Sequence, residues 1–343
     1  KAWEYSQDGF FGVFSNFPSE AASYHMSWIL AFFYSLTDRS PLMGQSISLI
    51  FGMGSVLIGA CIANKIWNEQ ISLKVGWVLA LYPTLILYSC LILREAYVWF
   101  FILIALYGVV CWFKEESFKS LIITFVGFFL ATFYHGGMFI GGLIFLSILL
   151  LFYLRQILKS LKNFKISIKS LIILICSILS LFYFLYIADD IPKKLSFKYL
   201  MNLDFLLQEI SMRNVNSAGY PEWTIPKSFF ELIYKAPIRI MYFLFSPFPW
   251  DVTKPNHVIG LLDGTFFIIL FILLIKNFKK IWGDQTTRVI FIILAFYLIL
   301  FGISIGNFGT GLRHRTKFLI IFVLLVAPMF PNLTFNKKTK YKK

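Results

Sequence analysis

Long apolar runs alternate along this chain with short polar segments. Each run approaches the ~20 residues that cross ~30 Å of hydrocarbon. Only helices and closed barrels satisfy the backbone in lipid, and continuous apolar runs indicate helices rather than alternating strands. The expected fold class is therefore all-α, a polytopic integral membrane protein. We expect about nine spans, at residues 42–63, 75–92, 96–112, 119–134, 137–154, 170–187, 257–275, 288–305 and 316–331.

Three further segments break the regular pattern. Residues 27–36 are apolar but too short for a comfortable span, and they favour an interfacial helix. Residues 188–256 form the longest polar stretch, which we interpret as a long loop acting as a lid; inside it, the short and Pro-flanked segment 236–248 predicts an interfacial or re-entrant helix. Residues 1–343 thus form a single transmembrane domain. Because the chain begins with Lys1 rather than Met, we expect a further N-terminal span to precede it.

Composition narrows the class of function. Hydrophobic residues make up 58% of the chain, which excludes a soluble globular protein. The excess of 32 Lys and Arg over 17 Asp and Glu indicates basic cytoplasmic loops rather than a nucleic-acid partner. The four cysteines lack CxxC or metal-ligand spacing, so they predict neither disulfides nor a metal site. Nucleotide, dinucleotide, zinc-protease and serine-hydrolase motifs are all missing from the sequence, and we expect no cofactor.

Basic loops set the predicted orientation. The acid-free loop from Arg155 to Lys169, the loop 276–288 and the basic tail from Lys337 belong inside, and alternation places Lys65–Lys74 and Lys114–Lys119 inside too. The opposite ends then face outward, provided that residues 27–36 do not span: residues 1–41, Arg94-Glu95, His135-Gly136-Gly137, the loop 188–256 and Gly306–Arg315.

The stretch Gly306–Arg315 carries three glycines, His314 and the arginines Arg313 and Arg315 where only a short turn is expected. Glycines allow the backbone to bend and approach a ligand, and guanidinium groups suit a phosphate. The alternative is a membrane-edge turn with snorkelling arginines. Its outward position favours the phosphate, because positive charge is not the default on that side.

Other outward residues add candidates for an anion site. Arg94, Arg213 and Arg239 make this face rich in arginine, which suits the diphosphate of a polyprenyl-linked substrate. Singly, each also fits a structural ion pair. His135 precedes two glycines, and its near-neutral pKa allows a phosphate donor, a general base or a hydrogen-bonded helix contact.

Carboxylates and aromatic residues complete the candidate site. Asp8, in the first outer segment, is either a catalytic base or a surface acid. Trp223, Trp250 and Tyr220 either stack on sugar rings or belong to an interfacial aromatic belt. The carboxylates considered as bases are Asp8, Glu20, Glu95, Asp189, Asp190, Glu222 and Asp251.

Taken together, the layout resembles membrane glycan-assembly enzymes of the GT-C-like kind. The Arg-Glu-Ala segment at 94–96 and the span that ends near His135 are similar to Wzy/EpsG-type polysaccharide polymerases. The acid Asp8 before an amphipathic helix, followed by Leu81–Ser89, also resembles glycosyltransferases related to protein mannosyltransferases. Those enzymes usually carry an acid where this chain has Arg94.

The polymerase resemblance implies a GT-C-like helical bundle in a bacterial inner membrane, with inverting glycosyl transfer on its outer face. Both donor and acceptor would be polyprenyl-diphosphate-linked glycans among membrane lipids, with a chain-length regulator as a possible partner and no metal. The implied diphosphate ligands are Arg94, Arg313 and Arg315, with Arg213 and Arg239 near them; His135, His314 or Asp8 would move the proton. The alternatives are a transferase using a polyprenyl-phosphate sugar and a transporter of lipid-linked glycans.

Overall fold

The computed structural model describes residues 1–15, 22–161, 168–187, 202–213 and 218–332, and in these residues every regular element is a helix. The α-helices of the first half are α1 Ala2–Ser6, α2 Gly9–Ser15, α3 Ala22–Leu36, α4 Pro41–Ile66, α5 Glu69–Leu81, α6 Pro83–Ser89, α7 Glu95–Glu115, α8 Phe118–Tyr134 and α9 Phe139–Leu161. Those of the second half are α10 Ile168–Ile187, α12 Leu203–Met212, α13 Phe229–Phe245, α14 Pro255–Lys276, α15 Phe278–Gly283, α16 Gln285–Ser304 and α17 Phe308–Val326. Short 3-10 helices occur at Gly136–Met138, Glu222–Thr224, Pro249–Asp251 and Ala327–Met329.

The predicted class, a helical multi-pass membrane protein, is supported by helices of membrane-spanning length. Among the described residues five helices are long and apolar enough to cross a bilayer: Pro41–Ile66, Glu95–Glu115, Gly136–Leu161, His257–Lys276 and Gln285–Ser304. The pair α5 and α6 passes the same test only when the two helices are taken together, and it is bent by 62° where Pro83 begins α6. All nine predicted spans coincide with helices, but α8 is shorter, at 17 residues, and α17 carries charged residues within it.

The segment interpreted as a long loop is largely helical in its described part. It contains α12 and α13 with two 3-10 helices, and the predicted interfacial segment 236–248 mostly belongs to α13. This helix packs against α14, α16 and α17. The approach to α16 is close, because a Cβ added at Gly302 would lie 2.6 Å from Ile240 of α13. Glu20, Asp189, Asp190, Lys162, Lys165 and the tail from Lys337 lie outside the described residues.

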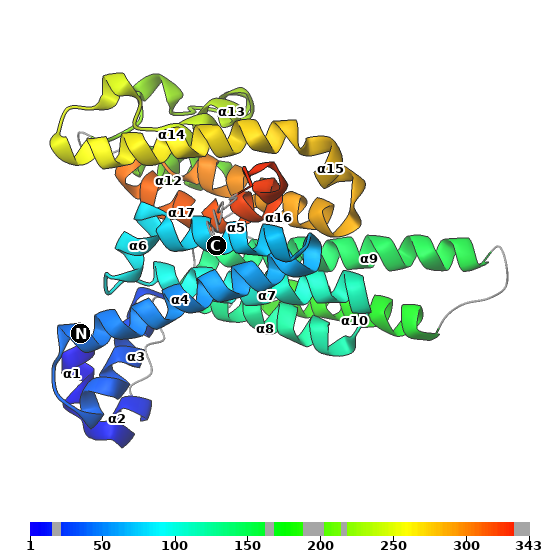
Figure 1. The fold of residues 1–343 in the computed structure, drawn as a ribbon, viewed down its shortest axis with the longest axis horizontal. Coiled ribbons are helices and arrows are strands. Elements are labelled where there is room, and N and C mark those ends of the chain that lie inside the picture. Colours follow the sequence, from blue (N-terminus) through cyan, green and yellow to red (C-terminus); the bar gives the residue numbers. More distant parts are fainter. Residues whose placement is uncertain (16–21, 162–167, 188–201, 214–217, 333–343) are drawn as a thin grey trace, which may run out of the picture.

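Two groups of helices meet at α17. Figure 1 shows α4, α7, α8 and α9 running roughly along the long axis beneath α14, α15 and α16, with α1–α3 at one end. Helix α17 contacts α4, α5 and α7 on one side and α13, α14 and α16 on the other. Every residue from Arg315 to Val326 is buried. Helices α7 and α17 therefore form the centre of the molecule.

The region Gly306–Arg315 is not the glycine-broken turn that we expected. Asn307 caps α17, its side-chain oxygen accepting hydrogen bonds from Gly309 N at 2.8 Å and Thr310 N at 3.2 Å. The helix therefore begins at Phe308, about two turns before the predicted span. Gly311 instead permits close packing, since an added Cβ would lie 3.0 Å from the Tyr220 hydroxyl.

A buried ion pair joins α14 to α17. Arg315 Nε donates to Asp263 Oδ2 at 2.7 Å, and both side chains are almost fully buried. The other guanidinium nitrogens donate to the carbonyl oxygens of Leu244, Ser246 and Gly260. The broken pair α5 and α6 completes the site by donating to Asp263 Oδ1, from Thr84 Oγ1 at 2.6 Å and Tyr82 Oη at 3.2 Å. Arg315 thus ties together α13, α14 and α17.

Arg315→Met is expected to lower the free energy of unfolding in detergent by about 3–5 kcal/mol, because it leaves Asp263 buried without its cation. Asp263→Asn keeps the shape of the pair and the acceptor for Thr84, and should cost less. The matched control is Arg155→Met, on an exposed position of α9, expected within about 0.5 kcal/mol of the parent. Denaturant unfolding followed by circular dichroism measures all three. Equal stability of Arg315→Met and Arg155→Met would show that the pair is not structural.

Candidate functional site

Helix α17 presents its charged residues on two different faces. At ~100° per residue, Arg313 and Arg315 are separated by ~200° around the helix axis, whereas Arg313 and Lys317 are only ~40° apart. Arg315 faces Asp263 of α14, and Arg313 and Lys317 face Glu95 of α7. The two arginines predicted to bind one diphosphate therefore do not come together.

Glu95 lies at the centre of what we call the Glu95 cluster: Arg94, Glu95, His135, Arg313, His314 and Lys317. The Glu95 carboxylate is fully buried at the start of α7. It accepts a bidentate pair of hydrogen bonds from Arg313, from Nε at 2.5 Å and from Nη2 at 3.1 Å. Lys317 Nζ is 3.8 Å from the same Oε1 atom and is itself buried. Arg313 keeps 37% of its side chain exposed, so the cluster reaches the surface through this residue.

Two histidines extend the cluster toward α8. Lys317 Nζ lies 2.6 Å from His314 Nδ1, and since an ammonium group only donates, Nδ1 must accept. In the neutral ring, the proton of His314 is then on Nε2. The ring of His135 is edge-on to that of His314, with centroids 5.0 Å apart. His135, in the connection between α8 and α9, therefore lies next to the pair formed by His314 and the buried Lys317.

Arg94 and His135 have polar atoms without a partner in the described part of the chain. Arg94 Nη1 makes one long bond, 3.4 Å to the carbonyl oxygen of Tyr134, while its buried Nε has none. His135 Nδ1 is also shielded from solvent and unbonded. Burial first, and then the positive charges of Lys317 and Arg94, hold the pKa of His135 well below its usual range, so the ring is neutral near pH 7.

The charge balance makes the cluster a candidate anion site. The cluster holds three cationic side chains and a single carboxylate, which only Arg313 and Lys317 contact, and each unpaired positive charge is costly to bury. An incoming phosphate would find the exposed edge of Arg313, the free Nε of Arg94 and the imidazole of His135. No other predicted residue contributes to this group in a contact that the structure describes.

The remaining predicted residues lie elsewhere or are already bonded. Arg239 is fully buried, and its three nitrogens donate to the carbonyl oxygens of Thr224, Ile303 and Ile305. Arg239 therefore satisfies carbonyl groups at the C-terminal end of α16, as Arg315 satisfies a carbonyl group of α14. Arg213 is exposed and pairs with Glu209 at 2.9 Å.

Asp8 and two of the aromatic candidates are exposed, whereas the third aromatic candidate is buried. Asp8 is exposed in the turn between α1 and α2. Trp223 and Trp250 are exposed, at 57% and 73%, which suits a surface or interfacial position. Tyr220 is buried instead, and its backbone N donates to the carbonyl oxygen of Gly306 at 2.8 Å. This bond holds Tyr220 against Gly306, just before the start of α17.

Two charged residues were missed by the sequence interpretation. Lys317 lies in an apolar run, where an ionisable residue is a signal of function, and it follows Arg313 by four residues. Asp263 lies in another apolar run. The same rule would have singled it out and suggested a search for its basic partner, which is Arg315. Glu95 was considered as a base or as the partner of Arg94, whereas its bonded partner is Arg313.

Glu95 and Arg313 should show a coupling free energy of about 1–3 kcal/mol in a double-mutant cycle of Glu95→Gln and Arg313→Met. Glu95→Gln is the costlier single change, because it leaves the buried Lys317 without an anion, whereas Arg313→Met leaves Lys317 beside the carboxylate. Unfolding in detergent measures the four proteins. The control cycle uses Lys65 and Glu115, an exposed pair at 2.7 Å, for which coupling of at most about 1 kcal/mol is expected. Equal coupling in both cycles would contradict a buried Glu95 bridge.

Comparison of the chain with models of protein families, with curated proteins and with solved structures gives no match. The functional assignment therefore depends on the chemistry of the Glu95 cluster.

Proposed function

We propose that the protein is a membrane glycosyltransferase of the polysaccharide-polymerase type, acting on polyprenyl-diphosphate-linked glycans at the outer face of a bacterial inner membrane. The supporting observation is the Glu95 cluster, in which Arg313 and Lys317 contact one carboxylate and Arg94 is the residue before it, at the end of a helix of membrane-spanning length. A diphosphate anion would offset the excess of positive charge. The resemblance of the segment at 94–96 to Wzy/EpsG-type polymerases points in the same direction.

The proposed reaction is an inverting displacement. A hydroxyl oxygen of the acceptor glycan forms a bond to the anomeric carbon of the donor, and the bond from that carbon to the diphosphate oxygen breaks. The bonding electrons leave with the polyprenyl diphosphate, whose added negative charge is stabilised by Arg313 and Arg94. The hydroxyl proton passes to a base.

His135 is the best placed base in the cluster. Its ring is neutral near pH 7, and its buried Nδ1 is unbonded in the described structure. His314 is less suitable because its Nδ1 already accepts a hydrogen bond from Lys317. Asp8 lies in the exposed turn between α1 and α2, so we assign it no role in the reaction. Glu95 then positions Arg313 and Lys317.

A transporter of the same lipid-linked glycans is the second candidate, and the observation in its favour is the buried charge of Lys317 and of the pair Arg315–Asp263. Lys317, however, approaches Glu95, the first residue of α7, and so lies near the end of that helix. Ionisable groups at the end of a span suit a site that is reached from the membrane surface. We therefore favour the enzyme.

Deletion of the gene in its source organism should leave single glycan repeat units on the polyprenyl carrier at the outer face, with long chains lost. Complementation with Arg94→Ala or Arg313→Ala should reduce polymer by about 100-fold or more, the cost of removing a donor that stabilises developing charge. Arg155→Ala, at an exposed site, is the control and should restore full chains. Mass spectrometry of extracted lipid-linked glycans measures the products, and immunoblotting of membranes confirms equal insertion.

Other outcomes point to other functions. Repeat units confined to the inner face would indicate a transporter. Loss of one sugar with normal chain length would indicate a transferase of single sugars. Normal chains in the deletion strain, or in both arginine variants, would overturn the polymerase proposal.

A further inference from the structure

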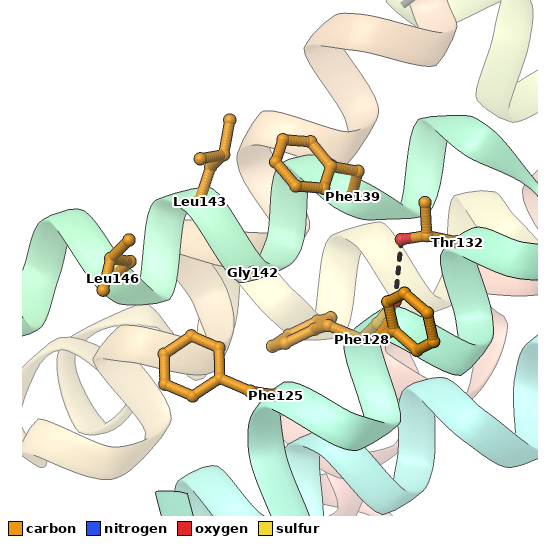
Figure 2. Close-up of a pocket in the computed structure, with 8 residues that line it drawn as sticks. Phe125, Phe128, Thr132, Phe139, Gly142, Leu143 and Leu146 are labelled. Carbon is orange, nitrogen blue, oxygen red and sulfur yellow. Dashed lines mark hydrogen bonds between the residues drawn. The ribbon is translucent and has the colours of Figure 1, made fainter. Parts of the chain in front are cut away.

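A groove of about 240 Å³ lies between α8 and α9, and none of its lining residues is charged. Figure 2 shows side chains from the two helices around it, with the Thr132 hydroxyl bonded to the carbonyl oxygen of Phe128. Its lining is almost entirely apolar and half aromatic: Phe125, Phe128, Phe129, Thr132, Phe139, Gly142, Leu143 and Leu146. The proposed reaction does not account for this surface.

The lining residues follow one stripe on each helix. On α8 the lining residues follow Phe125 by three, four and seven residues, and on α9 they follow Phe139 by the same numbers. Such spacing places each set on a single helix face. Gly142 keeps the groove open, because it is the one lining position without a side chain, and an added Cβ would lie 3.4 Å from Phe128.

The groove opens toward the surface that lipid would cover. Phe129 is 69% exposed and Phe125 is 36% exposed, whereas Phe128 closes the floor at 3%. On the interior side, a Cβ added at Gly141 would lie 2.5 Å from Phe128 and 2.1 Å from the Tyr297 hydroxyl, so no passage leads inward there. A ligand would enter this groove from the membrane rather than from the interior.

One end of the groove lies close to His135 along the chain. Thr132 is three residues before His135 and Phe139 is four residues after it, so both stripes come within about one helical turn of that histidine. Gly137, in the same connection, brings the backbone close to the ring of His135. A lipid whose anionic head occupied the cluster would therefore have this groove beside it as an apolar path into the membrane.

We propose that the groove between α8 and α9 binds the head-proximal part of a single polyprenyl chain whose phosphate occupies the Glu95 cluster. This inference deepens the proposed function and depends on it for the anion. The groove, at about 240 Å³, is smaller than the ~300–1,000 Å³ of pockets that enclose a drug-sized ligand, so it suits part of one chain rather than two chains side by side. Aromatic rings on both helices provide contacts for a branched, unsaturated chain.

The test uses the full chain in detergent with four probes: undecaprenyl phosphate, geranyl phosphate, dipalmitoyl phosphatidic acid and inorganic phosphate. Binding is measured by native mass spectrometry and by the shift of the unfolding temperature. The parent should bind undecaprenyl phosphate and geranyl phosphate about tenfold or more tightly than phosphatidic acid and inorganic phosphate, because both carry the single isoprenoid chain whose first units fill the groove. Equal binding of phosphatidic acid would overturn the preference for a single isoprenoid chain.

Leu143→Trp fills the groove and should lower the affinity for undecaprenyl phosphate about tenfold or more, with inorganic phosphate unaffected. Leu151→Trp makes the same change on the same helix, at a 51% exposed position outside the groove, and should behave as the parent. If Leu143→Trp binds undecaprenyl phosphate as the parent does, the groove is not the site of the chain.

Arg313→Ala separates this inference from the proposed function. It should weaken every phosphate-bearing probe, including inorganic phosphate. Loss in Leu143→Trp with no loss in Arg313→Ala would keep the groove and reject the cluster as its anion site. Loss in Arg313→Ala with no loss in Leu143→Trp would keep the cluster and reject the groove.

Discussion

The contact between Glu95 of α7 and the pair Arg313 and Lys317 of α17 is the interaction on which the arrangement of this bundle depends. Both helices are buried over most of their length, so their relative position fixes where the other helices can pack. A carboxylate inside such a core requires compensating cations. Arg313 supplies a bidentate contact, which also fixes orientation, and Lys317 adds charge from the next turn. The residues of the candidate site therefore also hold the central helices of the bundle together.

Helix α17 places its two arginines, Arg313 and Arg315, in two different environments. Arg315 has its guanidinium surrounded by a carboxylate and three carbonyl oxygens, and Arg239 has three carbonyl oxygens, so neither has a free face for a ligand. Arg313 has one anionic partner and remains partly exposed. The difference arises from helix geometry, because positions two apart face opposite sides. Counting arginines on one side of a membrane thus overestimates the number that can bind a substrate.

Much of the fold was predictable because hydrocarbon demands helices of a certain length, and continuous runs such as 96–112 show that length directly. The start of α17 was misjudged because Asn307 caps the helix before the apolar run begins, and glycines that suggested a turn serve close packing instead. The cluster was predicted in part: Arg94, His135, Arg313 and His314 were expected to be functional. Lys317 and the pairing of Glu95 were not, since contacts between α7 and α17 join residues 218 positions apart in sequence.

The position of His135 connects the two proposals. It ends α8, faces His314 on its interior side, and stands within one turn of the groove on both flanking helices. A lipid-linked anion needs two unlike environments within a few ångströms: cations for the phosphates and an apolar surface for the chain. Few positions in a helical bundle offer both, because buried charges are normally separated from the lipid-facing surface by packed side chains. The short α8, which ends at the level of the cluster, brings them together here.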